Sequence, residues 1–125
     1  MAISDDYIAF ARDLLSDLEP LRVKRMFGGA GIYSGELFFA ILVDNELYLK
    51  VDDANRADYE SRGLAPFSYE MKSGRTGTMS YYPPPPEVLE ERDALVQWAL
   101  KAVDAARRSA AGKRPGRRSQ GAGKA

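Results

Sequence analysis

Three glycines lie within four residues, at Gly28, Gly29 and Gly31, and raise the question of a phosphate-binding loop. A Walker loop requires G-x-x-x-x-G-K-[ST], and the chain has no such spacing. Gly29-Ala30-Gly31 begins a dinucleotide-binding pattern, but Ser34 stands where the third glycine should be. The pattern that follows predicts a strand, so the helix N-terminus that would bind the phosphate is missing. We therefore predict a bend or bulge within a strand, with structural roles for these glycines.

Four carboxylates, at Asp44, Glu46, Asp52 and Asp53, could bind a hard cation or a small molecule. Their spacing matches no EF-hand loop. Asp44 also suits a tight turn, and Asp52 or Asp53 suits the N-terminal cap of a helix. We favour these local roles and predict no metal, cofactor or catalytic residue, with small-molecule or metal binding as an alternative.

Tyrosines at Tyr48, Tyr69, Tyr81 and Tyr82 could stack on nucleic-acid bases if a sheet displayed them together. Such a surface needs cations on the same face, and the chain before residue 107 is acidic. Tyrosines on a half-buried sheet usually serve packing. We therefore favour packing over base recognition for these side chains.

The composition removes several classes of enzyme. The chain has no histidine and no cysteine, which excludes Ser-His-Asp and Cys-His catalysis and cysteine-based zinc sites. Proton transfer would depend on Asp, Glu, Lys or Tyr. We predict that the protein is not an enzyme.

The formal net charge of zero conceals a division along the chain. Residues 1–106 hold 11 basic and all 18 acidic residues, a net charge of −7. Residues 107–125 therefore form a cationic tail without acidic residues. This tail could make weak, salt-dependent contacts with nucleic acid, or it could simply keep the protein soluble. The seven remaining basic residues are Arg107, Arg108, Lys113, Arg114, Arg117, Arg118 and Lys124.

Hydrophobic periodicity predicts the elements that would position these residues. Ser4 suits a helix cap, Asp44-Asn45 a tight hairpin, and Gly63 a left-handed helix stop. Four prolines at 83–86 end the last strand and are favoured as a stiff connector over a polyproline ligand. Helices are predicted over 4–18, from Asp52 or Asp53 to Arg62, and from about Glu87. Strands are predicted over 21–26, 37–43, 47–51, 67–72 and 78–82. The continuous apolar run of the strand 37–43 predicts that it is covered on both faces.

The order α-β-β-β-α-β-β-α predicts an α+β domain. Its antiparallel sheet would have about five strands, with helices packed mainly on one face in two layers. We place this domain at 1–108 and a disordered basic tail at 109–125, because the tail has no large apolar residue to bury. The acidic start and the lack of a long apolar run predict a cytoplasmic protein without a membrane span.

Several segments together resemble the N-terminal domain of the TfoX/Sxy family. They are MFGGAGIY at 26–33, LFFAILVDNELYLKVD at 37–52, APFSYEM at 65–71, MSYYPPPPEVLE at 79–90 and Trp98 in the last helix. The resemblance runs from about Asp5 to Ala106. It implies a compact α+β domain similar to the two-layer fold of type III secretion chaperones. Full-length members regulate natural competence and are thought to act with the cyclic-AMP receptor protein.

The resemblance also implies a partner protein and no catalytic residues. Full-length regulators have a second domain, whereas this chain resembles the stand-alone N-terminal domain proteins. We expect a protein-interaction domain, an accessory to transcription or competence, which could also form a homodimer. The expected contact residues lie on an exposed sheet face or edge: Phe27, Tyr33, Tyr48, Tyr81 and Tyr82.

Overall fold

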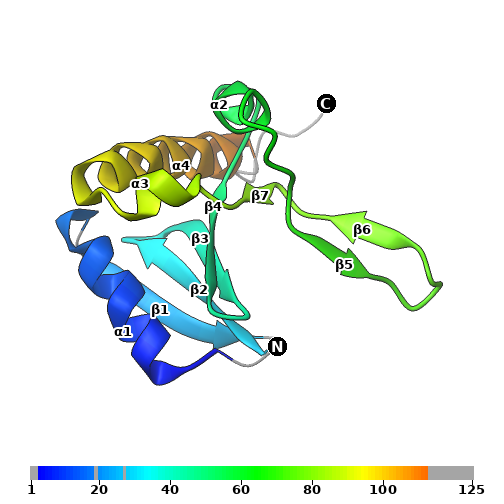
Figure 1. Ribbon diagram of the computed structural model, residues 1–125, viewed down its shortest axis with the longest axis horizontal. Coiled ribbons are helices and arrows are strands. Elements are labelled where there is room, and N and C mark those ends of the chain that lie inside the picture. Colours follow the sequence, from blue (N-terminus) through cyan, green and yellow to red (C-terminus); the bar gives the residue numbers. More distant parts are fainter. Residues whose placement is uncertain (1–2, 19, 27, 113–125) are drawn as a thin grey trace.

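The structure, a computed structural model, describes residues 3–18, 20–26 and 28–112. These residues form strands and helices in a single α+β arrangement, as predicted (Figure 1). In chain order the elements are α1 (Asp5–Leu14), the 3-10 helix η1 (Ser16–Leu18), β1 (Leu21–Met26), β2 (Gly29–Ser34), β3 (Leu37–Val43), β4 (Glu46–Lys50), α2 (Arg56–Glu60), β5 (Ser68–Glu70), β6 (Thr76–Thr78), β7 (Tyr81–Tyr82), α3 (Pro86–Leu89) and α4 (Arg92–Gly112).

Five strands form one antiparallel sheet in the order β1-β2-β3-β4-β7. The first four are consecutive in the chain and are joined as hairpins. β5 and β6 pair only with each other, as a ribbon that projects from the body of the molecule (Figure 1). The predicted five-stranded sheet is confirmed. However, the segment 67–82 supplies only the two-residue β7 to it, and the rest of that hairpin forms the ribbon.

The glycine-rich segment holds a complete chain reversal rather than a bend within one strand. β1 ends at Met26 and pairs directly with β2, so that Met26 lies opposite Gly29. Gly28, between them, has a φ of 77°, which glycine adopts without the steric cost of a Cβ atom. An irregularity does occur further on, where the β2–β3 register shifts between Ile32 and Tyr33. The first part of the chain therefore has four strands where the sequence predicted three.

Local signals in the sequence placed several element ends correctly. The Ser4 hydroxyl oxygen accepts a hydrogen bond from the Tyr7 backbone N–H at 3.1 Å and so caps α1. Asp44 and Asn45 have φ values of 54° and 59° and form a two-residue hairpin between β3 and β4. Gly63 follows α2 with a φ of 75°, the conformation expected of a left-handed helix stop.

The start of α2 differs from the prediction. The helix begins at Arg56 with Asn55 as its N-cap, and the Asn55 side chain makes no capping hydrogen bond to the first turn. Asp52 instead accepts a hydrogen bond from the Ala54 backbone N–H at 3.0 Å, within the turn that precedes the helix. Asn55 holds that turn against β4, because its side-chain oxygen accepts from the Asp52 N–H at 2.8 Å and its side-chain N–H donates to the Lys50 carbonyl oxygen at 3.2 Å. The carboxylate therefore orders the approach to the helix rather than its first turn.

The hydrophobic core lies between the helices and one face of the sheet. Helix α4 packs across β3 and β4, and its Leu95, Ala99 and Ala102 side chains are fully buried. The small alanines let the helix approach the sheet closely, where it meets the buried Leu42 and Leu49. α4 continues to Gly112, past the predicted domain boundary at residue 108.

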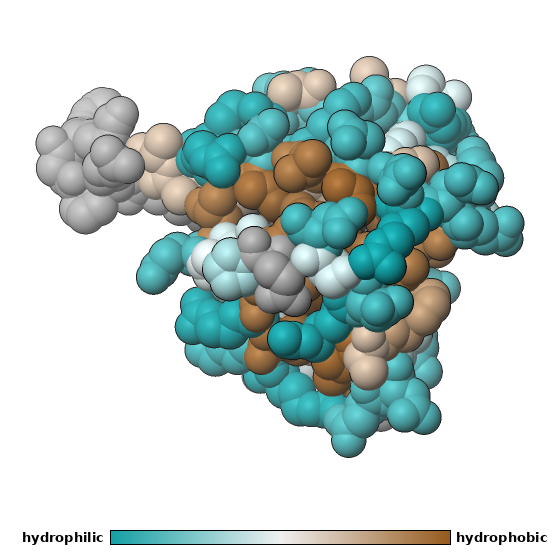
Figure 2. Space-filling model, turned by 90° about the vertical axis from the view of Figure 1, so that its left-hand side faces the viewer, coloured by the Kyte–Doolittle hydropathy of each residue, from teal (hydrophilic) through white to brown (hydrophobic). Residues whose placement is uncertain are grey.

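The surface on the side away from the ribbon is mostly hydrophilic, with a narrower band of apolar residues between the polar ones (Figure 2). Among the described residues, no helix has the length and apolar character that crossing a bilayer would require.

Candidate functional site

Strand register divides the side chains of the sheet between two faces, because successive residues point in opposite directions. One cross-strand row faces the helices and consists of Val23, Ile32, Ala40, Leu49 and Tyr82. The adjacent row points the other way and consists of Lys24, Gly31, Ile41 and Tyr48. We call these the core face and the open face. The open face is turned toward the ribbon.

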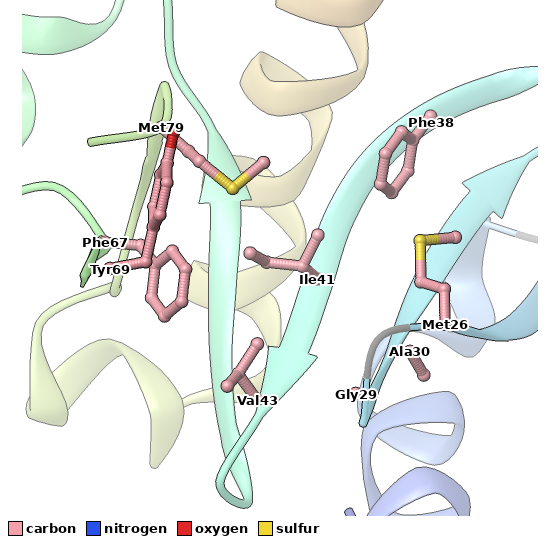
Figure 3. A pocket seen from close by; sticks show the side chains of 9 residues that line it. All are labelled: Met26, Gly29, Ala30, Phe38, Ile41, Val43, Phe67, Tyr69 and Met79. Atoms are coloured by element: carbon pink, nitrogen blue, oxygen red, sulfur yellow. The ribbon is translucent and has the colours of Figure 1, made fainter. Parts of the chain in front are cut away.

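An apolar groove of about 530 Å³ lies between the open face and the ribbon (Figure 3). Ile41 and Val43 of β3 lie between two walls, with Phe38 and Met26 on one side and the ribbon residues on the other. None of its lining residues comes from a helix. The lining consists of Met26, Gly29, Ala30, Phe38, Ile41 and Val43 from the sheet, with Phe67, Tyr69 and Met79 from the ribbon and its approach.

Glycine shapes the sheet side of the groove. A Cβ atom at Gly31 would lie 2.7 Å from Phe38 Cε1 and 3.0 Å from Met26 Cε, so its absence lets both side chains lie over β2. A Cβ atom at Gly29 would lie 2.3 Å from the carbonyl oxygen of Leu42. The absence of this atom therefore allows the β2 and β3 backbones to come close. These glycines serve side-chain and backbone packing at the positions where a phosphate loop was considered.

Aromatic rings continue along the open face from both walls. Tyr33 stacks on Phe38 with 4.9 Å between ring centroids, and Phe38 lies 5.7 Å from Tyr81. On the ribbon side, Tyr48 meets Phe67 edge to face at 5.1 Å. Such pairs stabilise their arrangement by about 0.5–1.5 kcal/mol beyond area burial. The groove is therefore a preformed structure held by its own side chains.

The ribbon leaves large apolar side chains accessible to solvent. Tyr69 and Met71 are each 44% exposed and Met79 is 37% exposed. Residues 67, 69 and 71 alternate along the strand and so share one side of the ribbon. Gly77, opposite Tyr69, makes room for its ring, because a Cβ atom there would lie 2.7 Å from Tyr69 Cζ. Three such side chains gathered beside one groove form a larger apolar surface than scattered exposed residues.

The open face also carries cations close to its rings. The Arg22 guanidinium carbon lies 4.6 Å from the Tyr33 ring centroid, and Lys50 Nζ lies 5.2 Å from that of Tyr81. Both geometries allow cation–π attraction. Lys24 lies on the same face, opposite Gly31. The groove is thus apolar at its centre, with cations beside Tyr33 and Tyr81 and the Glu46 carboxylate beside Tyr48.

A comparison with known protein families identifies the family of this chain. The TfoX N-terminal domain family matches residues 13–106, which include every strand and every residue of the groove. The chain belongs to this family. A comparison with curated proteins gave no match. The match covers most of the segment in which the family resemblance was seen, so the resemblance is confirmed.

In this TfoX N-terminal domain, the predicted contact residues separate between the two faces. Tyr33, Tyr48 and Tyr81 lie on the open face, around the groove. Tyr82 lies on the core face, where its ring is 5.3 Å from Tyr59 and its hydroxyl donates to Glu60 Oε2 at 3.0 Å. Phe27 lies outside the described residues. The structure therefore brings three of the predicted tyrosines near one surface and places one in the core.

Sequence reasoning missed most of the groove of the TfoX N-terminal domain. Leu37–Val43 was predicted to be covered on both faces, whereas α4 covers one face and the other forms the centre of the groove. Met26, Met79 and Phe67 were not singled out. The available signal was the alternation of Phe67, Tyr69 and Met71 on a segment bounded by turn residues. It predicts a ribbon with one apolar side.

Burial raises the pKa of two tyrosines on the open face, Tyr48 and Tyr81. It raises the pKa of Tyr48 to about 12, with further contributions from the Glu46 carboxylate that accepts its hydroxyl hydrogen bond at 2.9 Å. Burial likewise raises the pKa of Tyr81 to about 12, with a smaller contribution from Tyr33. A tyrosine with such a pKa is a poor general base at neutral pH, so the two side chains act here as apolar rings with hydrogen-bonding hydroxyls.

The four predicted carboxylates do not form one site in this domain. Asp44 and Glu46 lie at the start of β4, whereas Asp52 and Asp53 follow its end. Asp53 forms a salt bridge with Arg56, and Asp52 receives two hydrogen bonds from Arg108 at 2.6 and 2.9 Å. The described residues contain no group of three or more acidic, histidine or cysteine side chains able to hold a metal ion.

Two residues of the predicted basic tail belong to α4. Arg107 pairs with Asp104 at 2.7 Å, and Arg108 pairs with Asp52. Their charges are therefore already matched within the domain. Lys113, Arg114, Arg117, Arg118 and Lys124 lie outside the described residues, and their contact with nucleic acid stays a prediction.

Proposed function

We propose that this chain is a non-enzymatic protein-interaction domain and an accessory in the regulation of transcription, and that it binds a partner protein in the groove. The observation that carries the proposal is a preformed apolar groove beside three exposed apolar residues, Tyr69, Met71 and Met79. Exposed apolar area gathered in one place is typical of interaction sites.

The residue types in the groove favour a protein partner. Aromatic residues and methionine are enriched in protein interfaces, and methionine adapts its shape to different surfaces. A site for a small polar ligand normally adds a few convergent polar groups to fix orientation. In this groove only the Tyr69 hydroxyl is a polar side-chain group. A polar metabolite would therefore find little to orient it, whereas apolar side chains of a partner would find a complementary surface.

The non-enzymatic part of the proposal rests on the state of the titratable groups near the groove. The raised pKa values of Tyr48 and Tyr81 keep both side chains neutral, and the Glu46 carboxylate accepts a hydrogen bond from Tyr48. The regulatory part rests on the family, whose full-length members are regulators. These two parts can fail separately.

Two matched variants test the binding surface. Met79→Lys places a charge at the groove, and Leu100→Lys places the same charge on α4, where the side chain is 43% exposed. Met79→Lys should lower the capture of a specific partner at least about tenfold, because burying an unpaired charge in an interface is costly. Leu100→Lys should leave capture unchanged. Circular dichroism checks that both variants fold.

Equal capture by wild type, Met79→Lys and Leu100→Lys would overturn the groove as the binding surface. If capture depends on the groove but the partner has no connection with transcription, the regulatory role is wrong and the binding role stands. Mass spectrometry of the captured protein separates these outcomes.

A further inference from the structure

Charge is divided between the two sides of the described molecule. Acidic residues concentrate on the helical side and the segments leading into it: Asp5, Asp6, Asp13, Asp17, Asp52, Asp53, Asp58, Glu60, Glu87, Glu90, Glu91, Asp93 and Asp104. The open face carries Arg22, Lys24 and Lys50 on its strands, with Glu46 at its edge, Asp44 in the adjoining hairpin and Glu70 on the ribbon. The overall acidity of the body therefore does not describe the surface around the groove.

The cations on the two sides also differ in their partners. On the helical side most cations are held by carboxylates: Arg25 by Asp5, Arg56 by Asp53, Arg92 by Asp13 and Asp17, Lys101 by Asp58, and Arg108 by Asp52. Arg12 and Arg62 on that side form no salt bridge with any described residue, and Arg62 instead donates to the Asp58 carbonyl oxygen at 2.8 Å. Arg22, Lys24 and Arg75 form no salt bridge with any residue that the structure describes. These three cations are thus available to carboxylates from outside the domain.

Their positions place positive charge beside the β1 wall of the groove and at the outer end of the ribbon that forms the other wall. Arg22 and Lys24 precede Met26 at alternate positions of β1, so all three share the open face. Arg75 lies on the ribbon across from Met71, and the Met71 backbone N–H donates to the Arg75 carbonyl oxygen at 2.8 Å. A bound segment would meet apolar side chains at the centre and cations at both sides.

Resting on the proposed function, we propose that the groove binds a segment of a partner protein that carries large apolar side chains flanked by aspartate or glutamate. The apolar side chains occupy the space between Ile41, Phe38 and Met79. The carboxylates face Arg22 and Lys24 on one side and Arg75 on the other. Charge complementarity of this kind steers association and selects among partners more than it adds affinity.

A second copy of the chain fits the groove less well. A two-fold contact would bring the open face of one copy onto the open face of the other. Arg22, Lys24 and Arg75 of the two copies would then approach one another, and like charges brought together at an interface are unfavourable. A partner segment with carboxylates has no such conflict.

Single-stranded nucleic acid also fits less well, because the rings on the sheet are already engaged and Tyr69, 44% exposed, is the one described groove ring with a largely accessible face. Tyr33 lies between Phe38 and the Arg22 guanidinium, and Tyr81 is 5% exposed. The centre of the groove is aliphatic at Ile41 and Val43. Stacking platforms for bases need accessible ring faces.

A peptide selection tests the proposal on the full-length chain. A displayed library of random linear peptides is selected on wild type, with Met79→Lys as the counter-selection. Enriched peptides should combine large apolar residues with a net negative charge. A fluorescent synthetic copy of the most enriched peptide should bind Arg22→Glu/Lys24→Glu at least about tenfold more weakly than wild type, and rising salt should weaken its binding to wild type.

Arg12→Glu/Lys101→Glu serves as the matched control, because it changes the net charge equally on the helical side. It should bind the peptide as wild type does. Neutral or basic enriched peptides, or full binding by Arg22→Glu/Lys24→Glu, would overturn the charge proposal and leave the groove as a protein site. No enrichment beyond the counter-selection would overturn the proposed function as well.

Two further measurements test nucleic acid and a second copy of the chain as occupants of the groove. A labelled oligothymidylate that binds wild type and is lost specifically in Arg22→Glu/Lys24→Glu would assign the surface to nucleic acid and overturn the proposal. A dimer in sedimentation velocity that dissociates in Met79→Lys would assign the groove to a second copy and overturn it too. We expect neither result.

Discussion

The two faces of the sheet shield their apolar side chains from water in different ways. On the core face, Leu42 and Leu49 are buried by the helix α4. On the open face, Ile41 is nearly as well buried, at 7% exposure, although no helix residue lines the groove beside it. There the side chains cover one another, with Phe38 lying over Gly31. The difference suggests that the core face carries stability and that the open face is left accessible for binding.

The largest predicted contrast between the faces is in truncation to alanine. Leu42→Ala removes a fully buried side chain and should lower the free energy of unfolding by about 2–5 kcal/mol. Met79→Ala removes a side chain that is 37% exposed, and it should cost about 1 kcal/mol. Urea denaturation of both variants measures the difference. Equal losses of stability would show that the groove side chains are part of the core.

Two glycines separated by one residue sharpen the comparison. Gly29→Ala would place its Cβ against the Leu42 carbonyl oxygen, and backbone cannot move aside cheaply, so we expect a loss of about 1–3 kcal/mol. Gly31→Ala would meet the Phe38 ring and the Met26 methyl group, which can shift. Gly31→Ala should cost less stability and should narrow the groove, which weakens peptide binding. If Gly31→Ala were the more destabilising of the two by denaturation, the side chains over Gly31 would be more rigid than proposed.

A buried tyrosine offers a test by pH on the helical side. The Tyr59 side chain is 1% exposed, and its buried hydroxyl has no hydrogen-bond partner among the described residues. Burial, followed by the charge of Asp58, raises its pKa. Unfolded tyrosine ionises near pH 10, so the folded state loses stability as the pH rises above about 10. Tyr59→Phe should gain up to about 1 kcal/mol at neutral pH and lose less stability at high pH.

Denaturation midpoints at neutral and alkaline pH, compared between wild type and Tyr59→Phe, measure both effects. Tyr48 and Tyr81 also have a pKa raised to about 12, so the variant should keep part of the alkaline loss. A large destabilisation of Tyr59→Phe at neutral pH would mean that the hydroxyl has a partner.

The smallest predicted effect concerns the charges. Arg108→Ala removes the two hydrogen bonds to Asp52 and should cost less than about 1 kcal/mol, because both side chains are partly exposed. Lys24→Ala, on the open face, should change stability by less than about 0.5 kcal/mol, because Lys24 has no carboxylate partner among the described residues. Thermal denaturation of both variants checks the contrast.

Low pH should remove the stability difference between wild type and Arg108→Ala. The Arg108 guanidinium, above all through its hydrogen bonds, lowers the pKa of Asp52. The contribution of the pair is therefore present above the unfolded aspartate pKa and is lost as the pH falls through the folded value. Wild type and Arg108→Ala should converge in stability in that range. A difference that persists in acid would show that Arg108 acts through packing.

The sequence predicted what local chemistry decides. Ser4 and the Asp44-Asn45 pair each specify an element end through their own hydrogen bonds or φ values. The reversal at Gly28 was not distinguished from a bulge, because a glycine with positive φ suits both structures. The groove depends on pairing between residues far apart in the chain, which no local signal reports.

Tyr81 and Tyr82 show why the contact surface could be predicted only in part. Neighbours in a strand point to opposite faces, so one of them had to face the core once β7 paired with β4. Which one depends on the register, with Tyr82 opposite Leu49 and Tyr81 opposite Lys50. The sequence supplied the residue types and the alternation, whereas the register came only with the structure.

Site-specific photo-crosslinking tests the central claim most directly. A benzoylphenylalanine replaces Tyr69, which is 44% exposed beside the groove, or Phe10, which is 50% exposed on α1, in the full-length chain in native lysate. The account predicts an adduct from position 69 alone, mapped by mass spectrometry to a partner segment with apolar residues beside aspartate or glutamate. Equal adducts from both positions, or an adduct from position 69 to this same chain or to nucleic acid, would contradict it.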